Sequence, residues 1–333
     1  MKIKVCSLFS GAGGLDWGFH VNPNYEIVFA NDFMKEACKT YRHNFNNPSY
    51  LHEGDIKQLF DKIPQHDVLI GGFPCTPYSM AGLRKGLDDV RGLEVYSFSR
   101  VLDEKSPSYF IAENVQGILN HDDGKTLQTI LQLFKDLNYH VEYRLFDMSH
   151  FGVPQRRKRV IFFGSKNGTE FLHSISPIPQ TESLLLKNVL SNTSHEFNHN
   201  IHLATEAKQH WVKVLLEGEN LAHLSVEEIM MREVALGLPH REKPKTLTGY
   251  RRLDGNRIAP TMMFGNSCLP IHPTQERSLS VREAATIQSF PSDFVFLGGS
   301  AAQYKQVGNA VPPKFSILLA EEFAKVLENS SDK

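Results

Sequence analysis

The sequence lacks the features that mark secreted and membrane proteins. Its 333 residues contain only four cysteines, at positions 6, 38, 75 and 268, and these do not show the paired spacing of a disulfide framework. No apolar run approaches the length of a membrane-spanning helix, and the run after Lys2 and Lys4 is too short for a signal peptide. We therefore expect a cytoplasmic protein with reduced thiols and no association with membranes.

A strong net charge is also absent. The 36 Lys and Arg residues nearly balance the 37 Asp and Glu residues, and the formal charge of −1 does not by itself indicate a nucleic-acid-binding protein. Basic residues are instead concentrated locally, at 156–159 and between Arg241 and Arg257. Either cluster alone is more often a solvated surface than a binding site, so charge leaves the class of partner open.

The first half of the chain alternates between short apolar runs and amphipathic stretches. The sequence predicts strands at 3–9, 26–30, 68–70, 108–112 and 160–163, and helices from residue 15 onward and at 34–43, 93–103 and 126–137. Strands that alternate with helices favour the α/β class, here with a doubly wound, mostly parallel, Rossmann-like sheet.

After about residue 165 the composition changes to loops rich in Pro, Asn, Ser and His. Four histidines lie between His195 and His210, but no cysteine or carboxylate stands beside them at ligand spacing, so no metal site is expected. Ser225 and Glu228 form a capping-box pattern, which predicts a helix that ends near Gly237. Helical periodicity returns near residue 277. We expect one domain of residues 1–165 plus 276–333 and an inserted, smaller, loop-rich domain of residues 166–275.

A glycine-rich segment, residues 9–14 (Phe-Ser-Gly-Ala-Gly-Gly), directly follows the first expected strand. Glycines there let the backbone approach a ligand closely. Asp32 follows the second strand and Asp55 the next, where a carboxylate can accept hydrogen bonds from ribose hydroxyls. The glycine spacing differs from the G-x-G-x-x-G of dinucleotide-binding proteins. The pattern favours a nucleoside cofactor without a pyrophosphate and disfavours a nicotinamide dehydrogenase.

Cys75 lies between Pro74 and Pro77, after an apolar run that ends in Gly71 and Gly72. The prolines stiffen the backbone around the thiol, and the preceding strand places it at the carboxyl edge of the sheet, where α/β proteins bind ligands. These features make Cys75 a candidate nucleophile. A buried structural cysteine is the alternative that this segment alone leaves open.

Taken in order, these segments and several others resemble the motifs of the DNA (cytosine-5)-methyltransferases of bacterial restriction-modification systems. The further matches are residues 113–115 (Glu-Asn-Val), 155–159 (Gln-Arg-Arg-Lys-Arg), 277–291 and 308–312. The resemblance covers residues 3–165 and 276–320 and is weak between them, in the family's variable target-recognition region. Thr76 and Tyr78 depart from the family pattern, which usually has Gln and Phe there, so we expect adjusted loop contacts rather than lost activity.

The resemblance implies a methyltransferase that uses S-adenosyl-L-methionine and releases S-adenosyl-L-homocysteine. Cys75 would add to C6 of a flipped-out cytosine, and Glu113 would contact N3 of that base. Arg157 would face the base, and Arg159 would anchor the site or a phosphate. The implied cofactor-binding residues are Phe9, Gly11, Gly13, Gly14, Asp32, Phe33, Asp55, Ile56, Pro74, Asn309 and Ala310.

The resemblance also implies double-stranded DNA as the partner, contacted by a glycine-hinged loop and by the basic stretch near residue 250. The expected DNA contacts are Ser79, Arg84, Lys85, Arg91, Lys243, Lys245, Arg251, Arg252 and Arg257. The protein would act as a monomer near the bacterial nucleoid, paired in function with a cognate restriction endonuclease. The alternatives are a tRNA cytosine-5 methyltransferase on the same scaffold and a catalytically inactive DNA-binding regulator.

Overall fold

The computed structural model describes residues 2–73, 94–194, 196–201, 206–244, 250–262 and 269–331. Its contacts divide the chain into two compact units. Unit 1 comprises Met1–Phe151, Arg157–Ile178 and Ala310–Lys333, and unit 2 comprises Gly152–Arg156 and Pro179–Asn309. These limits differ from the domain boundaries expected from the sequence, because residues 276–309 pack within unit 2 and residues 166–178 within unit 1. The division into a catalytic and a target-recognition domain concerns function, and it stays a prediction.

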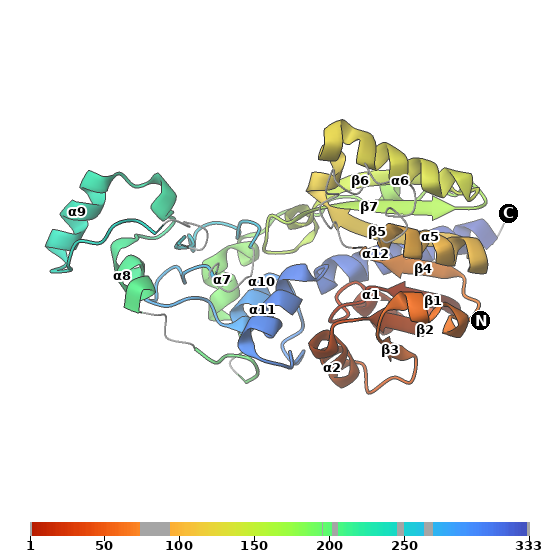
Figure 1. Ribbon diagram of the computed structural model, residues 1–333, viewed down its shortest axis with the longest axis horizontal. Helices are drawn as coiled ribbons and strands as arrows, with labels where there is room; N and C mark the ends of the chain where they lie inside the picture. The colour runs from red at the N-terminus through yellow and green to blue at the C-terminus, as the bar shows by residue number, and fades with distance from the viewer. Residues whose placement is uncertain are drawn as a thin grey trace. The chain divides into compact units, whose positions relative to one another are not determined.

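Unit 1 is built on a seven-stranded sheet with the order β3-β2-β1-β4-β5-β7-β6 (Figure 1). The strands β3, β2, β1, β4 and β5 are parallel to their neighbours, and β7 is antiparallel to both β5 and β6. The bounds are β1 Ile3–Leu8, β2 Tyr25–Asp32, β3 Leu51–Glu53, β4 Val68–Gly71, β5 Tyr109–Val115, β6 His140–Asp147 and β7 Lys158–Ser165. The expected doubly wound, mostly parallel α/β sheet is confirmed.

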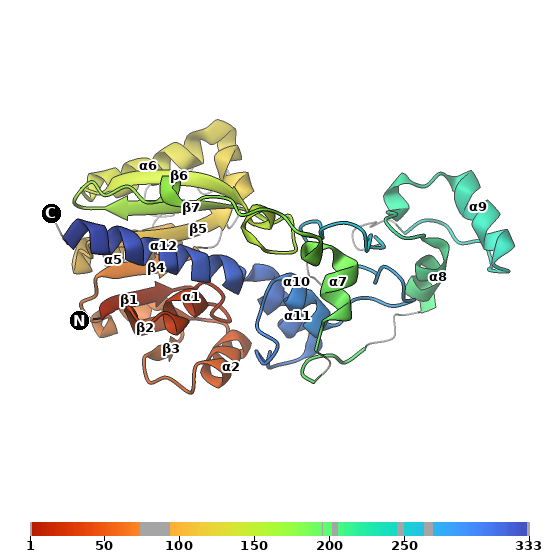
Figure 2. The same cartoon turned by 180° about the vertical axis from the view of Figure 1, so that it is seen from behind.

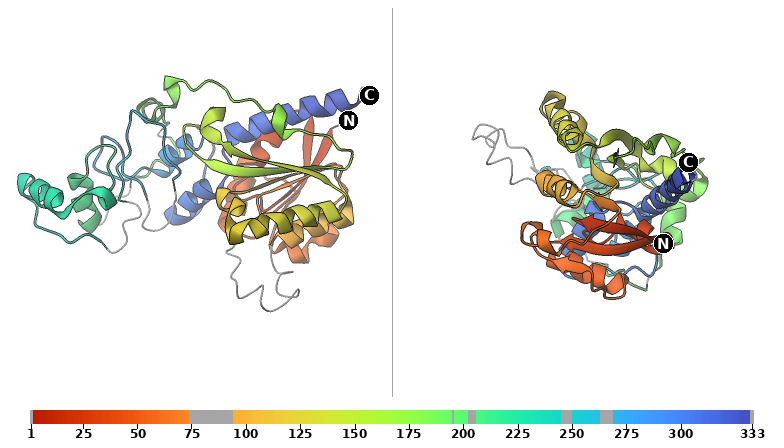
Figure 3. Two further views of the ribbon diagram at one scale, coloured as in Figure 1. Left: turned by 90° about the horizontal axis from the view of Figure 1, so that it is seen from above. Right: turned by 90° about the vertical axis from the view of Figure 1, so that its right-hand side faces the viewer.

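Helices cover both faces of this sheet (Figures 2 and 3). Phe323 packs against Tyr109 and Phe163, whereas Phe134 packs against Phe110 and Phe162. Because neighbouring residues of a strand point to opposite faces, these contacts place α12 and α6 on opposite sides. The helices of unit 1 are α1 Asp16–Val21, α2 Lys35–Asn44, α5 Glu94–Lys105, α6 Lys125–Asp136 and α12 Pro313–Ser331.

The strands expected from the sequence do not include β6. Its residues alternate between charged and apolar side chains and remain partly exposed, since β6 is an edge strand that pairs only with β7. An edge strand of this kind lacks the continuous apolar run by which buried parallel strands are recognised.

The described part of unit 2 consists of helices and irregular chain packed on small apolar clusters, one of which contains Trp211 and another Met262. Its helices are α7 Leu186–Ser191, α8 Glu206–Val214, α9 Val226–Ala235, α10 Val281–Ile287 and α11 Ser300–Asn309. The predicted capping box is present at α9, where Ser225 Oγ accepts from the Glu228 N–H at 3.1 Å. Ser280 and Glu283 form a second capping box at α10.

Short 3-10 helices complete the description of both units. They are η1 Ile56–Gln58, η2 Phe60–Lys62, η3 Gln116–Leu119, η4 His121–Gly124, η5 Met148–Phe151, η6 Leu172–Ser174, η7 Glu182–Leu184 and η8 Leu221–His223. Within the described ranges, every helix is too short or too polar to cross a membrane.

Candidate active site

The ends of four parallel strands meet at one edge of the sheet in unit 1. Leu8, near the end of β1, pairs with Asn31 of β2 on one side and with Gly71 of β4 on the other, and Gly71 pairs with Ala112 of β5. The segments that follow β1, β2 and β4 therefore lie next to one another, beside Glu113. The chain moves outward from β1 to β3 and then returns to β4 on the other side of β1, so this edge is a topological switch point, where α/β sheets bind ligands.

The glycine-rich segment after β1 forms a tight loop. Phe9, Gly11 and Gly13 have positive φ angles of 57°, 57° and 90°. A Cβ on Gly13 would lie 2.5 Å from the Phe45 ring, so this glycine is required by packing. A Cβ on Gly11 would meet no atom of the described residues within 4 Å. Gly11 therefore borders open space, into which a ligand can approach the backbone.

The last motif of the chain packs against the same loop. A Cβ on Gly14 would lie 2.4 Å from the Val311 carbonyl oxygen and 2.9 Å from the Ala310 Cβ. The absence of a side chain on Gly14 thus allows residues 310–311 to pack directly against the loop, as the expected cofactor role of Ala310 requires. Asn309, the other residue expected from this motif, ends α11 and belongs to unit 2.

Two acidic residues lie at this edge, Asp32 as the last residue of β2 and Asp55 two residues after β3. The Asp32 carboxylate accepts hydrogen bonds from the Gly11 N–H at 2.8 Å and from the Met34 N–H at 2.7 Å, so it is fixed beside the loop. Asp55 accepts from the Lys57 N–H at 3.0 Å and caps η1. Ile56 is buried in the core, whereas Phe33 is 67% exposed at the end of β2.

Asn31 is a contributor that the sequence did not single out. Its buried Nδ2 donates to the carbonyls of His52 and Gly54, both at 3.0 Å, and it thereby ties the end of β2 to the loop that carries Asp55. Its position directly before Asp32 is the only signal of this role in the sequence.

Glu113 lies within an electropositive group. The carboxylate is buried, and its Oε1 lies 2.6 Å from Nε of Arg159. Arg157 is also fully buried. Burial and the charge of Arg159 lower the pKa of Arg157, and the charge of Glu113 opposes this shift, so Arg157 interacts with both residues. The structure therefore brings together three of the four residues expected to be catalytic.

The strands that carry this group are longer than the sequence predicts. The strand expected at 108–112 continues as β5 through Glu113 to Val115, which pairs with Arg159. The strand expected at 160–163 begins earlier, as β7 at Lys158, so it contains Arg159 but not Arg157. The two arginines still reach one cluster, since the backbone carbonyl of Arg157 accepts from the Met148 N–H at 2.9 Å and fixes the entry to β7.

The segment that leads toward Cys75 is anchored to β5. Nδ2 of Asn114 donates to the carbonyl of Phe73 at 3.0 Å, so the chain is held one residue before Pro74. Asn114 belongs to the Glu-Asn-Val motif but was not among the expected site residues. The remaining candidates in this region, namely Pro74, Cys75, Ser79, Arg84, Lys85 and Arg91 together with Thr76 and Tyr78, lie outside the described residues.

The candidate DNA contacts in unit 2 have different environments. Arg251 is exposed, and the Arg257 side chain is 80% exposed, with its Nε 3.1 Å from Oδ2 of Asp254. Lys243 is half-buried, and its Nζ donates to the Leu224 carbonyl. Lys245 lies outside the described residues.

Arg252 requires a correction. It is 7% exposed, and its Nε donates to the Leu215 carbonyl at 2.8 Å while its terminal nitrogens reach four more carbonyls. Two of the five acceptors, on Val212 and Leu215, lie at the end of α8, where helix carbonyls lack intrahelical partners. A guanidinium used in this way is not available to a phosphate, so Arg252 is a structural residue.

Replacing Arg252 with methionine is therefore expected to lower the stability of unit 2 by about 2–3 kcal/mol, because several buried carbonyls lose their donor. Arg251→Ala is the matched variant. It should leave the melting temperature unchanged, weaken binding to duplex DNA and reduce the salt dependence of that binding. Thermal unfolding and fluorescence anisotropy with labelled DNA distinguish the two. A wild-type melting temperature for Arg252→Met would contradict the assignment.

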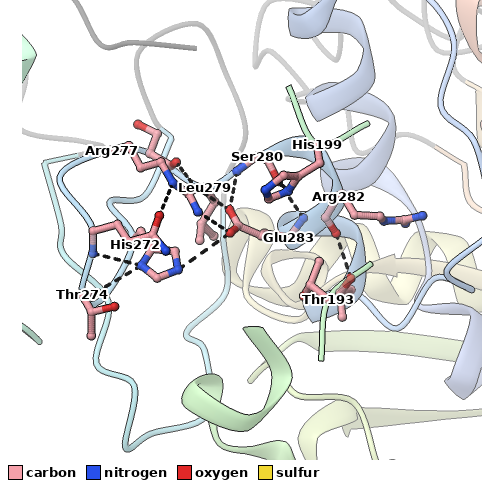
Figure 4. A network of polar contacts seen from close by, with 12 residues as sticks. Thr193, His199, His272, Thr274, Arg277, Leu279, Ser280, Arg282 and Glu283 are labelled. Atoms are coloured by element: carbon pink, nitrogen blue, oxygen red, sulfur yellow. Dashed lines mark hydrogen bonds and ion pairs between the residues drawn. The ribbon is translucent and has the colours of Figure 1, made fainter. Parts of the chain in front are cut away.

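The motif at residues 277–291 organises unit 2 internally. Arg277 donates to both carboxylate oxygens of Glu283, at 2.7 and 2.6 Å, and the Ser280 N–H donates to the same carboxylate at 2.7 Å (Figure 4). His272 Nε2 lies 3.8 Å from this carboxylate, and burial lowers the pKa of His272 to about 4, so the imidazole is neutral near pH 7. The Glu283 charge is thus balanced by Arg277.

A buried carboxylate lies behind the glycine loop. Asp16 is fully buried and accepts hydrogen bonds from Ser7 Oγ at 2.8 Å and from Tyr41 Oη at 2.9 Å. Burial raises the pKa of Asp16 to about 6, and these hydrogen bonds oppose the shift. The pKa of Asp16 in the folded protein lies above its ordinary value. Ionisation of Asp16 therefore lowers the free energy of unfolding by about 3 kcal/mol in total, and this loss develops as the pH rises from about 4 to about 6. An acid kept at that cost beside the glycine-rich loop is a candidate functional residue.

Comparisons with known proteins show which family the chain belongs to. The C-5 cytosine-specific DNA methylase family model matches residues 3–325. The chain is 33% identical over 346 residues to the type II methyltransferase M.NgoFVII of Neisseria gonorrhoeae, covering 100% of this chain and 89% of that protein. It is 33% identical over 342 residues to the type II methyltransferase M.MthTI of Methanothermobacter thermautotrophicus, covering 98% and 99%.

Among solved structures, the fold is similar to that of a prophage-encoded Escherichia coli protein described as a DNA modification methyltransferase. The TM-score is 0.73 at 21% sequence identity, and the match covers 98% of this chain and 100% of that chain. The family match and the relatives together show that the chain belongs to the C-5 cytosine-specific DNA methylase family and is a DNA (cytosine-5)-methyltransferase.

Proposed function

We propose that this protein transfers a methyl group from S-adenosyl-L-methionine to C5 of a flipped-out cytosine in a specific sequence of duplex DNA. The observation that carries the proposal is the grouping, at one sheet edge, of a glycine loop open at Gly11, the fixed carboxylate of Asp32 and the buried Glu113–Arg159 pair. A loop and an acid at adjoining strand ends suit a nucleoside, and the neighbouring ion pair suits a polar heterocycle.

The residues present fit the methyl donor. The open side of Gly11 lets backbone N–H groups approach a ligand. The Asp32 carboxylate, held by the Gly11 and Met34 N–H groups, lies at a strand end, where an acid can accept a hydrogen bond from a ribose hydroxyl. The exposed ring of Phe33 offers a face to adenine. When bound, S-adenosyl-L-methionine supplies an electrophilic methyl group, and S-adenosyl-L-homocysteine is the product. Asp55, Ile56 and Ala310 are the other residues of unit 1 proposed to bind the methyl donor, and Pro74 and Asn309 are proposed from the sequence alone.

The cytosine chemistry is assigned to Cys75, Glu113 and the two arginines. A bond from the Cys75 thiolate to C6 moves the electron pair of the C5–C6 double bond toward C5, which becomes nucleophilic. N3 is a hydrogen-bond acceptor, so Glu113 assists this addition in its protonated form, by donating its proton to a hydrogen bond with N3, and positive charge from Arg157 and Arg159 supports the addition. After methylation, loss of the C5 proton to a base and departure of the thiolate restore the aromatic ring.

The DNA must present its cytosine outside the helix, because a stacked base cannot reach buried groups, and flipping costs a few kcal/mol. Among the described residues, Arg251 and Arg257 are proposed to contact DNA directly. Lys243 is proposed to lie at the edge of the contact surface, because its Nζ donates to the Leu224 carbonyl. Ser79, Arg84, Lys85, Arg91 and Lys245 are proposed from the sequence alone. Residues 166–275 are proposed to select the target.

The names of the relatives support a cellular role in restriction-modification, since both are type II methyltransferases. The methylation would protect DNA from a cognate restriction endonuclease, in the bacterial cytoplasm and by a monomeric enzyme. The test is transfer of a labelled methyl group from S-adenosyl-L-methionine to duplex DNA, with 5-methylcytosine identified by nucleoside mass spectrometry. Label in tRNA and not in DNA would favour the tRNA methyltransferase, and bisulfite sequencing would locate the target.

Gly72 provides a structural test of the Glu113 assignment. A Cβ on Gly72 would lie 3.0 Å from Glu113 Oε2, closer than nearly all real contacts of this kind. Gly72→Ala should therefore displace the carboxylate by a few tenths of an ångström and lower kcat by about tenfold or more. Affinity for S-adenosyl-L-homocysteine and the melting temperature should stay close to wild type. An unchanged kcat would count against the role of Glu113 at the base.

A further inference from the structure

The carboxylate of Asp16 is the end point of a chain of hydroxyl groups. Ser7 Oγ donates to Asp16 Oδ1 at 2.8 Å and also lies 2.8 Å from Ser10 Oγ. A hydroxyl has a single hydrogen, and that of Ser7 is given to the carboxylate. In the bond between the two serines, Ser10 is then the donor and Ser7 the acceptor as long as Asp16 is ionised; Ser10 Oγ also lies 3.5 Å from the Ser7 carbonyl, a weaker acceptor at that distance. Ser10 belongs to the glycine loop.

A second arm of the same carboxylate supports the other side of the loop. Tyr41 Oη donates to Asp16 Oδ2 at 2.9 Å, and the Tyr41 ring stacks on Phe45 with centroids 3.9 Å apart. A Cβ on Gly13 would lie 2.5 Å from Phe45 and 3.1 Å from Tyr41, so the two rings form the wall against which Gly13 packs. The Gly13 N–H donates to the Ser10 carbonyl at 2.8 Å and joins the two arms.

We propose that Asp16 is a positioning residue for the methyl donor, whose ionised carboxylate holds the loop of residues 9–14 in its binding conformation. Protonation of Asp16 makes one of its oxygens a donor. The hydroxyl group bonded to that oxygen, of Ser7 or of Tyr41, must then accept instead of donate, and its own hydrogen needs a new acceptor. Affinity for the donor therefore falls with the protonation of Asp16. The inference rests on the proposed function, because it requires the loop to hold the donor.

The groups around Asp16 identify it as the source of such a pH dependence. Burial raises its pKa to about 6, while Ser7, Tyr41 and Ser10 oppose the shift. Cys6 on β1, Tyr41 on α2 and Tyr50 before β3 interact with it electrostatically, and burial raises the pKa of each, so they stay neutral between about pH 5 and 8. Helix α12 meets α1 through Ser316, which does not titrate in this range.

His20 on α1 is the neighbour that needs a control. Burial lowers its pKa from 6.5, and its ring packs against Phe45 with centroids 4.7 Å apart. His20→Gln removes this titration while it leaves the hydrogen bonds of Asp16 in place. If Asp16 is responsible, the midpoint of the pH profile is the same in His20→Gln and in wild type.

The experiment is calorimetric titration of the full chain with S-adenosyl-L-homocysteine between about pH 5 and 8. Wild type is expected to show constant Kd above about pH 7 and a rise of about tenfold as the pH falls through about 6, with protons released on binding near the midpoint. Asp16→Asn should bind about tenfold more weakly at all pH values, because an amide accepts at only one atom. Asp136→Asn, at an exposed acid of α6, is the matched control and should behave as wild type.

Two milder variants keep the test sharp if Asp16→Asn folds poorly. Tyr41→Phe and Ser7→Ala each remove a hydrogen bond that lowers the Asp16 pKa, so each should move the midpoint of the wild-type profile to higher pH. A role confined to stability would not move it. A flat profile in wild type, or midpoints unchanged in both variants, would overturn the inference while the proposed function stands. Absence of binding by wild type would overturn both.

Discussion

Cys75→Ser is expected to abolish methyl transfer to duplex DNA while DNA binding persists. The serine hydroxyl is far less acidic than a thiol and does not supply an anion able to add to C6 near neutral pH. Loss of a covalent nucleophile should lower the rate by at least about 10³-fold. Incorporation of labelled methyl groups measures the first effect, and electrophoretic mobility shift of a target duplex measures the second.

Cys6→Ala is the matched control for this variant. Cys6 is buried in β1, and burial raises the pKa of its thiol, so it is unreactive and its loss should leave methyl transfer near the wild-type rate. A duplex with 5-fluorocytosine at the target should trap a covalent complex with wild type and with Cys6→Ala but not with Cys75→Ser. Full activity of Cys75→Ser would remove Cys75 from the mechanism.

Gly18→Ala is expected to lower the stability of unit 1 by about 3 kcal/mol or more. A Cβ at this position would lie 2.1 Å from the carbonyl oxygen and 2.2 Å from the carbonyl carbon of Ser316, where α1 meets α12. Backbone atoms cannot avoid a methyl group by changing rotamer, so one helix must shift and the hydrogen bond from the Gly18 N–H to Ser316 Oγ, 3.0 Å long, is strained or lost. The melting temperature should fall by at least about 5 °C.

Gly299→Ala separates this steric effect from a general cost of replacing glycine. A Cβ on Gly299 would meet no atom of the described residues within 4 Å, and its φ lies outside the left-handed region, so its melting temperature should match wild type. A wild-type melting temperature for Gly18→Ala would show that α1 and α12 do not approach as closely as described.

The central strands could be predicted from the sequence because a strand that is buried on both faces consists of a nearly continuous run of apolar residues. The expected strand at 160–163 lies inside β7, and the one at 68–70 lies inside β4. The same reasoning failed for β6, whose charged residues and one-sided pairing leave no such run. Capping residues were equally informative at Ser225, because a cap depends on contacts within four residues.

The basic residues show where local sequence stops being sufficient. Arg251 and Arg252 are adjacent and chemically identical, yet one is exposed and the other donates to carbonyls from α8 and from residues 272–275. Which arginine faces inward depends on acceptors that are 20 or more residues away in the chain. A charge run therefore indicates a basic region but not which members of it are free to contact DNA.

The sequence by itself determined the family, through motifs that occur in the family's order between residues 9 and 312. The same motifs identified the candidate site residues. Only the tertiary structure decided that Glu113 contacts Arg159, because their meeting depends on the antiparallel register of β5 and β7. It also decided that Asp16, Asn31 and Asn114 form hydrogen bonds with the segments that carry the expected residues. The physical reason is that burial and hydrogen-bond partners are set by strand pairing across the sheet, which no local pattern of residues specifies.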